Sequence, residues 1–183
     1  MGTEMCIRDR GILCSGASMV PVPNTATSEA QRNMLLDSAV KGLFVSDQYR
    51  DAALQHFMDI PSIRADLRFA LETACAEFHD HKIWANTFDA GSPNVHMALD
   101  EEYDILYSSG TTGIPKGIIH SHLARNLLIL GTEKMEFEGG VVLTSTPLYS
   151  NTTITTWWPS VWVGATQVLS LIHISEPTRL PPI

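Results

Sequence analysis

The stretch DILYSSGTTGIPKGIIHSHLARNLLILGTEK (Asp104–Lys134) decides the fold that we expect for this chain. The apolar run Asp104–Ser108 predicts a strand, and Gly117–His120 predicts a second strand after a loop. Ser121–Lys134 then predicts a helix, with Ser121 as its cap, because leucines recur there near the helical period. These leucines are Leu123, Leu127, Leu128 and Leu130. The stretch therefore predicts a strand–loop–strand–helix unit.

The loop inside this unit has the composition of a phosphate-binding loop. All six residues of Ser108–Gly113 are Ser, Thr or Gly. Glycines let the backbone approach a ligand closely, and the surrounding amides and hydroxyls supply donors with little side-chain bulk. Lys116 adds a positive charge on a long stem. The loop lacks the Gly-Lys-Ser/Thr ending of a Walker A motif and the G-x-G-x-x-G of a Rossmann fingerprint, so it predicts a polyphosphate cradle of another type.

Strand-like and helix-like runs alternate on both sides of this unit. We expect further strands at Ser18–Val22, Leu43–Ser46, Leu67–Glu72, Val141–Thr146 and Ala165–Leu169, and further helices at Ser28–Val40, Tyr49–Met58, Phe78–Phe88 and Thr152–Val163. Thr27 or Ser28 is expected to cap the first of these helices, with Gln31 in capping-box position after Ser28. Such alternation predicts an α/β fold, a mostly parallel sheet with helices on both faces.

Bulk composition excludes several classes of function. The chain has 183 residues, of which 44% are hydrophobic and 17% charged, as in a globular domain. Its net charge of −8 and the lack of a Lys/Arg cluster argue against nucleic acid and against an anionic membrane surface as partners. Three cysteines without a C-x-x-C pair favour a reducing, cytoplasmic location. We also expect no transmembrane segment and no secretory signal.

YSSGTTGIPKG (Tyr107–Gly117), followed by IIHSH, resembles the signature phosphate loop of the adenylate-forming (AMP-binding) superfamily. That superfamily includes acyl-CoA synthetases, aryl-CoA ligases, luciferases and peptide-synthetase adenylation domains. The flanking segments Gly16–Val45 and Thr144–Leu169 also resemble its upstream G-A-x-x-V-P strand with the following helix and its downstream P-L-F-H region. The resemblance covers nearly all of Gly11–Leu169 and implies an incomplete part of the large N-terminal domain of an acyl-CoA synthetase or ligase.

This resemblance implies a reaction and its residues. A carboxylate attacks the α-phosphate of ATP, giving acyl-AMP and pyrophosphate, and the acyl group then passes to a thiol, most often that of coenzyme A. Ser108, Ser109, Gly110, Thr111, Thr112 and Gly113 would wrap the ATP phosphates. Thr111, Thr112 and Lys116 would hold the β and γ phosphates, with Thr111 and Lys116 as the catalytic pair. Tyr149, Ser150 and Asn151 would lie near the acid. ATP, Mg²⁺, coenzyme A and a small carboxylic acid are the implied ligands.

The chain departs from the family pattern in two ways. Ser150 stands where the family often has His after Pro-Leu-Phe, and the polar stretch Ser150–Thr153 would suit a polar or aromatic acid. No segment after Leu169 matches the Tyr-Gly-x-Thr-Glu magnesium-binding element, the ribose-binding aspartate or the late catalytic lysine. We therefore expect that residues 1–183 alone do not complete adenylation and that the protein ligand of Mg²⁺ lies outside them.

Both ends of the chain read differently from its middle. MCIRDR (Met5–Arg10) and SLIHISEPTR (Ser170–Arg179) resemble sequencing-library adapter translated as protein. We expect residues 1–10 and 170–183 to be artefacts of this kind, and residues 11–169 to form the partial AMP-binding domain. Ordinary flexible tails are the alternative, because Pro177, Pro181 and Pro182 would stop any regular element.

Smaller signals have structural explanations. The pairs His79/His81 and His120/His122 lack further ligands nearby in sequence, so we expect no metal site. Trp157, Trp158 and Trp162 lie on an apolar helix and are expected in the core or in the wall of the acid pocket. Cys75 is expected to be a small buried residue without nucleophilic function.

Two other classes of function compete with a ligase fragment. A stand-alone nucleotide-binding module would need the phosphate loop and no distant lysine. A non-functional truncated reading frame would leave its apolar strands without partners, and it would aggregate.

Overall fold

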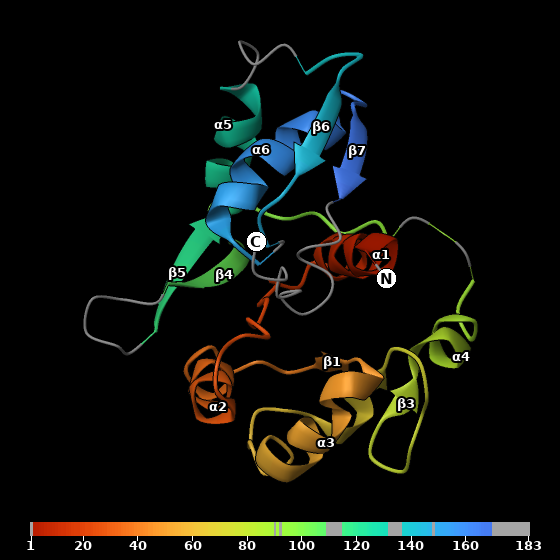
Figure 1. The fold of residues 1–183 in the computed structure, drawn as a ribbon. Helices are drawn as coiled ribbons and strands as arrows, with labels where there is room; N and C mark the ends of the chain where they lie inside the picture. Colours follow the sequence, from red (N-terminus) through yellow and green to blue (C-terminus); the bar gives the residue numbers. More distant parts are fainter. Residues whose placement is uncertain are drawn as a thin grey trace, which may run out of the picture. The chain divides into compact units, whose positions relative to one another are not determined.

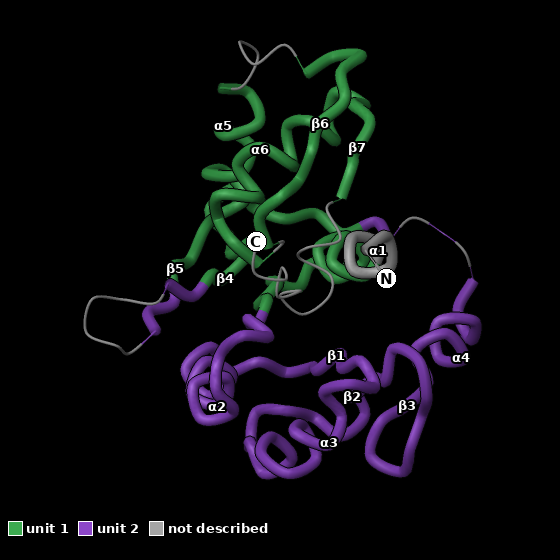
Figure 2. The backbone as a smooth tube through the Cα atoms, viewed as in Figure 1, with its two compact units in different colours: residues 1–21, 95–106, 118–183 green, residues 22–94, 107–117 purple. Residues whose placement is uncertain are grey.

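The computed structural model describes residues 2–89, 91, 93–108, 115–131, 137–147 and 149–169. Its chain divides into two compact units (Figure 1, Figure 2). Unit 1 comprises residues 1–21, 95–106 and 118–183, and unit 2 comprises residues 22–94 and 107–117. Among the described residues, no helix is long and apolar enough to cross a membrane.

Unit 2 is built on a small parallel sheet. The strands β1 (Leu43–Val45), β2 (Arg68–Ala70) and β3 (His79–Asp80) lie in that order and pair in parallel. Its helices are α2 (Ser28–Asp37), α3 (Asp47–His56), the single 3-10 turn η1 (Ala65–Leu67) and α4 (His81–Ala85). Parallel strands need helical crossovers, and α3 supplies the connection from β1 toward β2.

The core of unit 2 forms where α2, α3 and the sheet meet. Leu35 of α2, Ala53 of α3 and Phe78 before β3 are almost completely buried together, and Ile60 and Ile63 of the intervening loop join them. Each of the leucine, isoleucine and phenylalanine side chains among them contributes roughly 1.5–3 kcal/mol when buried. The strands of this unit are only two or three residues long, so side-chain burial holds them more than ladder hydrogen bonds do.

Helix α2 begins where a hydroxyl caps it. Thr27 has extended backbone angles, and its side chain accepts a hydrogen bond from the amide of Ala30. The expected capping box after Ser28 is wrong, because Thr27 is the cap and Gln31 donates instead to the carbonyl of Pro23. The side chain of Gln31 therefore ties the helix to the segment that precedes it.

Unit 1 contains the remaining elements. Helix α1 (Gly2–Cys14) comes first, followed by the strand pair β4 (Glu102–Ser108) and β5 (Lys116–Ser121), which extends at its loop end into unit 2. Helix α5 (His122–Leu130) follows β5 directly. Strands β6 (Val141–Thr144) and β7 (Thr166–Leu169) pair in parallel through the crossover helix α6 (Asn151–Trp162), which packs on both strands and on α5.

The α/β class with parallel pairing is confirmed, although the strands in the described part of the chain form three small sheets. The expected strand Ser18–Val22 is wrong, since only Met19 pairs, in a single parallel bridge to Asp104. The expected helix Phe78–Phe88 is confirmed only in its middle, as the shorter α4, because β3 occupies its start and Asp80 caps α4. Residues 2–10 belong to helix α1, and Ser170–Arg179 lie outside the described residues, so the expected adapter origin of both ends stays a prediction.

The leucine stripe of α5 does not face the core. Leu123, Leu127 and Leu130 are exposed, with 57% of Leu127 accessible, whereas the buried residue of the helix is Arg125. The cap at Ser121 is confirmed, because its hydroxyl accepts from the amide of Ala124. The apolar period therefore predicted the helix correctly, and it did not indicate which face is buried.

Candidate functional site

The frame of the phosphate loop is a pair of strands. Ser108 is the last residue of β4, Lys116 is the first residue of β5, and both side chains are exposed. The predicted phosphate-binding residues Ser109, Gly110, Thr111, Thr112 and Gly113 lie outside the described residues. The predicted strand–loop–strand frame is thus confirmed, and the roles of the loop residues stay a prediction.

Tyr107 fixes the entrance to this loop within unit 2. Its hydroxyl donates to Asp37 Oδ2 at 2.7 Å, and it also lies 3.1 Å from the carbonyl oxygen of Met34. Burial, with the hydrogen bond to Asp37 as the next contribution, raises the pKa of Tyr107 to about 12. The phenol therefore stays neutral and bonded at physiological pH, and it anchors the end of β4 to α2.

A buried ionic cluster lies in unit 1, on the strands that continue into the loop. Asp104 of β4 is completely buried, and Arg125 of α5 is 4% exposed. Arg125 donates from Nε to Asp104 Oδ2 at 2.9 Å and from Nη2 to Oδ1 at 2.8 Å. His120 of β5 places its Nδ1 2.8 Å from the same Oδ1. Asp104 thus accepts two hydrogen bonds from Arg125 and lies within hydrogen-bonding distance of His120, as a buried carboxylate requires.

The cluster reaches one of the predicted acid-site residues. Arg125 donates from Nη1 to the side-chain oxygen of Asn151 at 3.0 Å. Asn151 is the first residue of α6, and Ser150, the N-cap, makes no side-chain capping bond. The segment of Tyr149, Ser150 and Asn151 is therefore held from α5 as well as by its own helix.

The turn before α6 is held by buried hydroxyls. Thr153 is 1% exposed, and its Oγ1 donates to the carbonyl of Pro147 at 2.6 Å while lying 2.6 Å from Thr146 Oγ1. The amide of Ser150 donates to the same carbonyl at 2.9 Å. The hydroxyl of Thr153, expected with its neighbours to suit a polar acid, is thus occupied by the turn.

The predicted residues fall into two sets. Ser108 and Lys116 belong to the strand pair around the loop, and Lys116 is assigned to unit 2. Tyr149, Ser150 and Asn151 belong to unit 1. The two sets of predicted residues therefore belong to different units of the chain.

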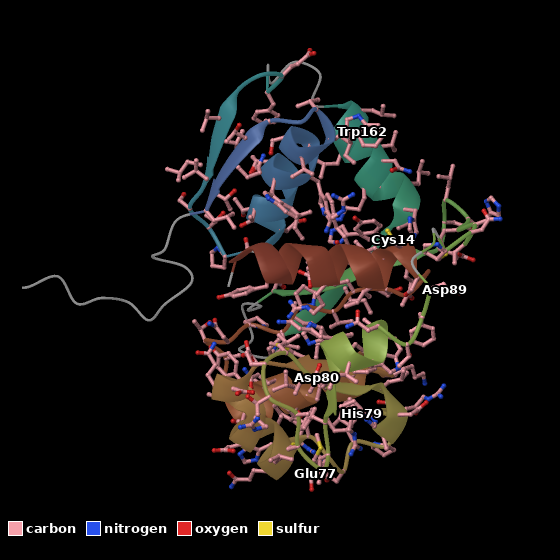
Figure 3. All side chains as sticks on the ribbon, turned by 90° about the vertical axis from the view of Figure 1, so that its right-hand side faces the viewer. Cys14, Glu77, His79, Asp80, Asp89 and Trp162 are labelled. Atoms are coloured by element: carbon pink, nitrogen blue, oxygen red, sulfur yellow. The ribbon has the colours of Figure 1, made fainter. Side chains whose placement is uncertain are left out.

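The tryptophans of α6 divide between core and surface. Trp157 is buried and lies 4.8 Å from Trp158, ring centre to ring centre, and Trp158 meets Tyr103 edge-on. Burial, with the neighbouring Asp104 charge second, raises the pKa of Tyr103 above its ordinary value. Trp162, labelled in Figure 3, is 73% exposed, so it does not lie in the core.

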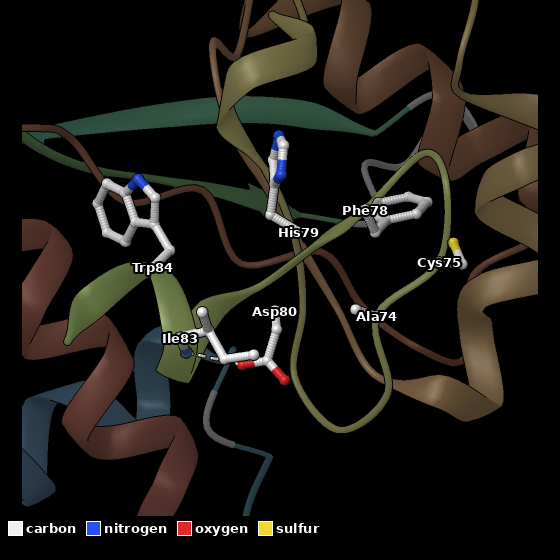
Figure 4. Close-up of a pocket in the computed structure, with 7 residues that line it drawn as sticks. All are labelled: Ala74, Cys75, Phe78, His79, Asp80, Ile83 and Trp84. Carbon is white, nitrogen blue, oxygen red and sulfur yellow. Dashed lines mark hydrogen bonds between the residues drawn. The ribbon is translucent and has the colours of Figure 1, made fainter. Parts of the chain in front are cut away.

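A shallow hollow of about 380 Å³ lies in unit 2 (Figure 4). Two of its polar side chains, Asp80 and Cys75, already have hydrogen-bond partners. Asp80 accepts from the amides of Lys82 and Ile83 at the start of α4, and the thiol of Cys75, which is half buried, points to Glu77. None of the predicted site residues that the structure describes lines it.

The histidine pairs have structural partners. Nδ1 of His81 lies 3.0 Å from the carbonyl oxygen of Ala70, and Nδ1 of His120 belongs to the ionic cluster. Among the described residues, no three His, Cys, Asp or Glu side chains gather in a way that would hold a metal ion.

Comparison with known proteins gives the family. The sequence model described as AMP-binding enzyme matches residues 1–180. The chain belongs to the AMP-binding enzyme family. Malpibaldin synthetase of Mortierella alpina is 24% identical to this family member over 179 residues, covering 97% of the chain and 3% of the relative. The 4-hydroxybenzoate–CoA/benzoate–CoA ligase of Rhodopseudomonas palustris is 28% identical over 112 residues, covering 61% and 20%.

Solved structures agree on the fold of this AMP-binding family member. The N-terminal domain of FACL13 from Mycobacterium tuberculosis superposes with a TM-score of 0.74 at 22% identity, covering 91% of this chain and 41% of that one. The o-succinylbenzoate CoA synthetase of Bacillus subtilis, solved with its acyl-adenylate intermediate, gives 0.68 at 18%, covering 91% and 40%. The chain thus has the fold of part of a CoA-ligase N-terminal domain and spans well under half of these relatives.

Sequence reasoning missed Asp104 and Arg125. Both interrupt patterns that are otherwise apolar, one in the strand Asp104–Ser108 and one beside the leucine stripe of α5. A lone acid and a lone base in adjoining apolar elements were the available signal, because buried charges are rare unless they pair.

Proposed function

We propose that the protein containing this chain is an ATP-dependent ligase that joins a carboxylic acid to coenzyme A. In the first step a carboxylate oxygen attacks the α-phosphorus of ATP, and the bond to the bridging oxygen breaks, releasing pyrophosphate and leaving acyl-AMP. In the second step a thiolate sulfur attacks the acyl carbon and AMP leaves, giving a thioester. Membership of the AMP-binding enzyme family is the observation that carries this proposal.

The phosphate loop would supply the electrostatic part of the first step. Ser108–Gly113 would surround the phosphates with amides and hydroxyls, while Thr111, Thr112 and Lys116 would hold the β and γ phosphates. The exposed ammonium of Lys116 at the start of β5 suits that task, since charge develops on the departing pyrophosphate. Anchoring of Tyr107 by Asp37 supports a fixed loop entrance.

Tyr149, Ser150 and Asn151 would lie beside the acid. Ser150 has the smaller, uncharged side chain at a position where the family often has His, which leaves the type of acid open. A benzoate-type acid has support from the R. palustris relative, whose name gives 4-hydroxybenzoate and benzoate. Tyr149 and the hydroxyl of Ser150 would suit an aromatic acid with a polar substituent.

Mg²⁺ would accompany ATP and neutralise phosphate charge. The described residues contain no cluster of acidic ligands for it, so we propose that its protein ligand lies elsewhere. Coenzyme A as acceptor has support from the relatives named as CoA ligases, and a carrier-bound thiol is the second candidate in view of the M. alpina synthetase. We also propose a cytoplasmic location, supported by the odd cysteine count without C-x-x-C pairs.

The first experiment tests nucleotide binding by residues 1–183. Isothermal titration with Mg-ATP should show one site, and Lys116→Ala should weaken binding by about tenfold, because one charge-assisted phosphate contact is lost. Lys82→Ala, which removes a lysine of α4 outside the predicted loop, is the matched control. Equal affinities of all three proteins would contradict the proposed role of Lys116.

The second experiment tests the reaction. The complete gene product should catalyse acid-dependent exchange of pyrophosphate into ATP with at least one acid of a panel of aliphatic and aromatic carboxylates. Residues 1–183 alone should not, since they span 41% or less of the relatives reported above. ATP binding by the complete gene product without exchange would favour the stand-alone nucleotide-binding module, and aggregation without binding would favour a non-functional chain.

Reading the source DNA through the codons for residues 1–10 and 170–183 tests the proposed adapter origin of both ends. A continuous genomic frame that encodes these residues would overturn it.

A further inference from the structure

The ionic cluster of Asp104, His120 and Arg125 has no part in the chemistry proposed above, although Arg125 contacts Asn151 of the proposed acid-side segment. We propose that Asp104 and Arg125 are positioning residues for the acid side of the reaction and that they act through Asn151. This inference rests on the proposed function and deepens it, because it names residues that set the acid-binding segment without touching the acid.

The guanidinium of Arg125 divides its donors between two partners. Nε and Nη2 are used by Asp104, which is completely buried and accepts both. Nη1 is turned the other way, to the side-chain oxygen of Asn151. A guanidinium is planar and rigid, so fixing one edge on Asp104 also fixes the direction of the other edge. Asp104 therefore fixes the position of the Arg125 Nη1 group that donates to Asn151.

The start of α6 lacks the usual side-chain cap. Serine hydroxyls usually cap a helix, but Ser150 makes no side-chain capping bond here. Asn151, the next residue, is instead held across from α5 by Arg125. Tyr149 and Ser150 immediately precede it in the chain. The position of the predicted acid-site segment thus depends on a side chain from another helix.

The buried pair of Asp104 and Arg125 is better suited to fixing an orientation than to adding stability. A buried ion pair is a weak source of stability, because replacing both partners with apolar residues of similar volume is often neutral or stabilising. Such a pair does fix direction, since it tolerates few geometries. Asp104 and Arg125 join β4 to α5, and His120 adds β5, so the cluster orients Asn151 from a rigid base.

The test uses two variants that remove the same contact from opposite sides. Asn151→Ala removes the exposed acceptor and leaves the buried pair intact. The double variant Asp104→Leu with Arg125→Met replaces the pair by apolar residues and leaves Asn151 in place. Asn126→Ala, an exposed substitution beside Arg125, is the matched control. All are made in the complete gene product and, separately, in residues 1–183.

In the complete gene product, both variants should raise the KM for the acid by about tenfold and leave the KM for ATP within about twofold. The triple variant should resemble Asn151→Ala alone, because the two changes remove one interaction. An unchanged acid KM in the double variant would overturn the inference, since Asn151 would then act by itself. A wild-type protein without acid-dependent exchange would instead refute the proposed function.

Hydrogen–deuterium exchange on residues 1–183 tests the positioning independently of activity. Both variants should raise the exchange rate of amides in residues 151–154 by roughly tenfold relative to Asn126→Ala, while amides of α3 in unit 2 stay unchanged. Unchanged exchange at the start of α6 in both variants would overturn the inference even if no acid is found.

Discussion

Removing the buried carboxylate of Asp104 should destabilise unit 1 far more than removing an exposed one. In Asp104→Ala, Arg125 loses the acceptor of its Nε and Nη2, and His120 loses the partner of its Nδ1, while Arg125 remains 4% exposed. Leaving one partner of a buried pair without the other costs about 3–5 kcal/mol. That is a large share of the roughly 5–15 kcal/mol by which domains are stable.

Urea denaturation measures this loss. Trp84→Phe removes the tryptophan of unit 2, so that the fluorescence comes from Trp157, Trp158 and Trp162 of α6 in unit 1. With a slope of about 2 kcal/mol per molar urea, the midpoint should fall by roughly 1.5–2.5 M.

Glu102→Ala is the matched control, because it removes an exposed carboxylate from the start of the same strand. Its midpoint should move by less than about 0.3 M. If the urea midpoint of Asp104→Ala decreases by less than about 0.5 M, the reasoning is refuted, because the pair would then behave as a surface salt bridge.

Three further outcomes follow from the described contacts. The phenol of Tyr107, with its pKa raised to about 12, contributes stability below about pH 10 that is lost as pH rises through 12. Asp37→Asn should lower this pKa, measured by the absorbance of tyrosinate during a pH titration, and an unchanged titration curve would contradict the prediction. Gly16 has a φ of +81°, so Gly16→Ala should lower the free energy of unfolding by roughly 1–2 kcal/mol. Gly11→Ala inside α1 should instead raise it by roughly 0.5–1 kcal/mol, and urea midpoints of the two variants that move in the same direction would contradict the prediction. Leu127→Ala should cost under about 1 kcal/mol, against about 2–5 kcal/mol for a core leucine, and a midpoint shift of core size would show that the stripe is buried.

Local sequence determined the elements whose signals are short-range. Apolar residues bounded by a Gly- and Ser-rich loop placed β4 and β5, because strand propensity and loop chemistry are read from neighbouring residues. Ser121 marked the start of α5, since a capping hydroxyl acts within one helical turn. The motif Tyr107–Gly117 is dense enough to indicate the family by itself, because all of its residues are contiguous in the chain.

Only the tertiary structure decided which side of each element is buried. The leucine period of α5 gave the helix and not its orientation, because periodicity defines an apolar face without saying whether a neighbour covers it. Likewise, Trp157 is buried and Trp162 exposed on one helix, which depends on where α5 and the β6–β7 pair contact it.

The ionic cluster illustrates the same limit most clearly. Asp104 and Asn151 lie 21 and 26 residues from Arg125 along the chain, so no local pattern connects the three. Their contact depends on the pairing of β4 with β5 and on the packing of α5 against α6. The sequence by itself determined the family, the loop and most of the elements, because these are encoded in adjacent residues. Tertiary structure alone decided the buried charges and the support of the acid-side segment, because packing brings distant residues within hydrogen-bonding distance.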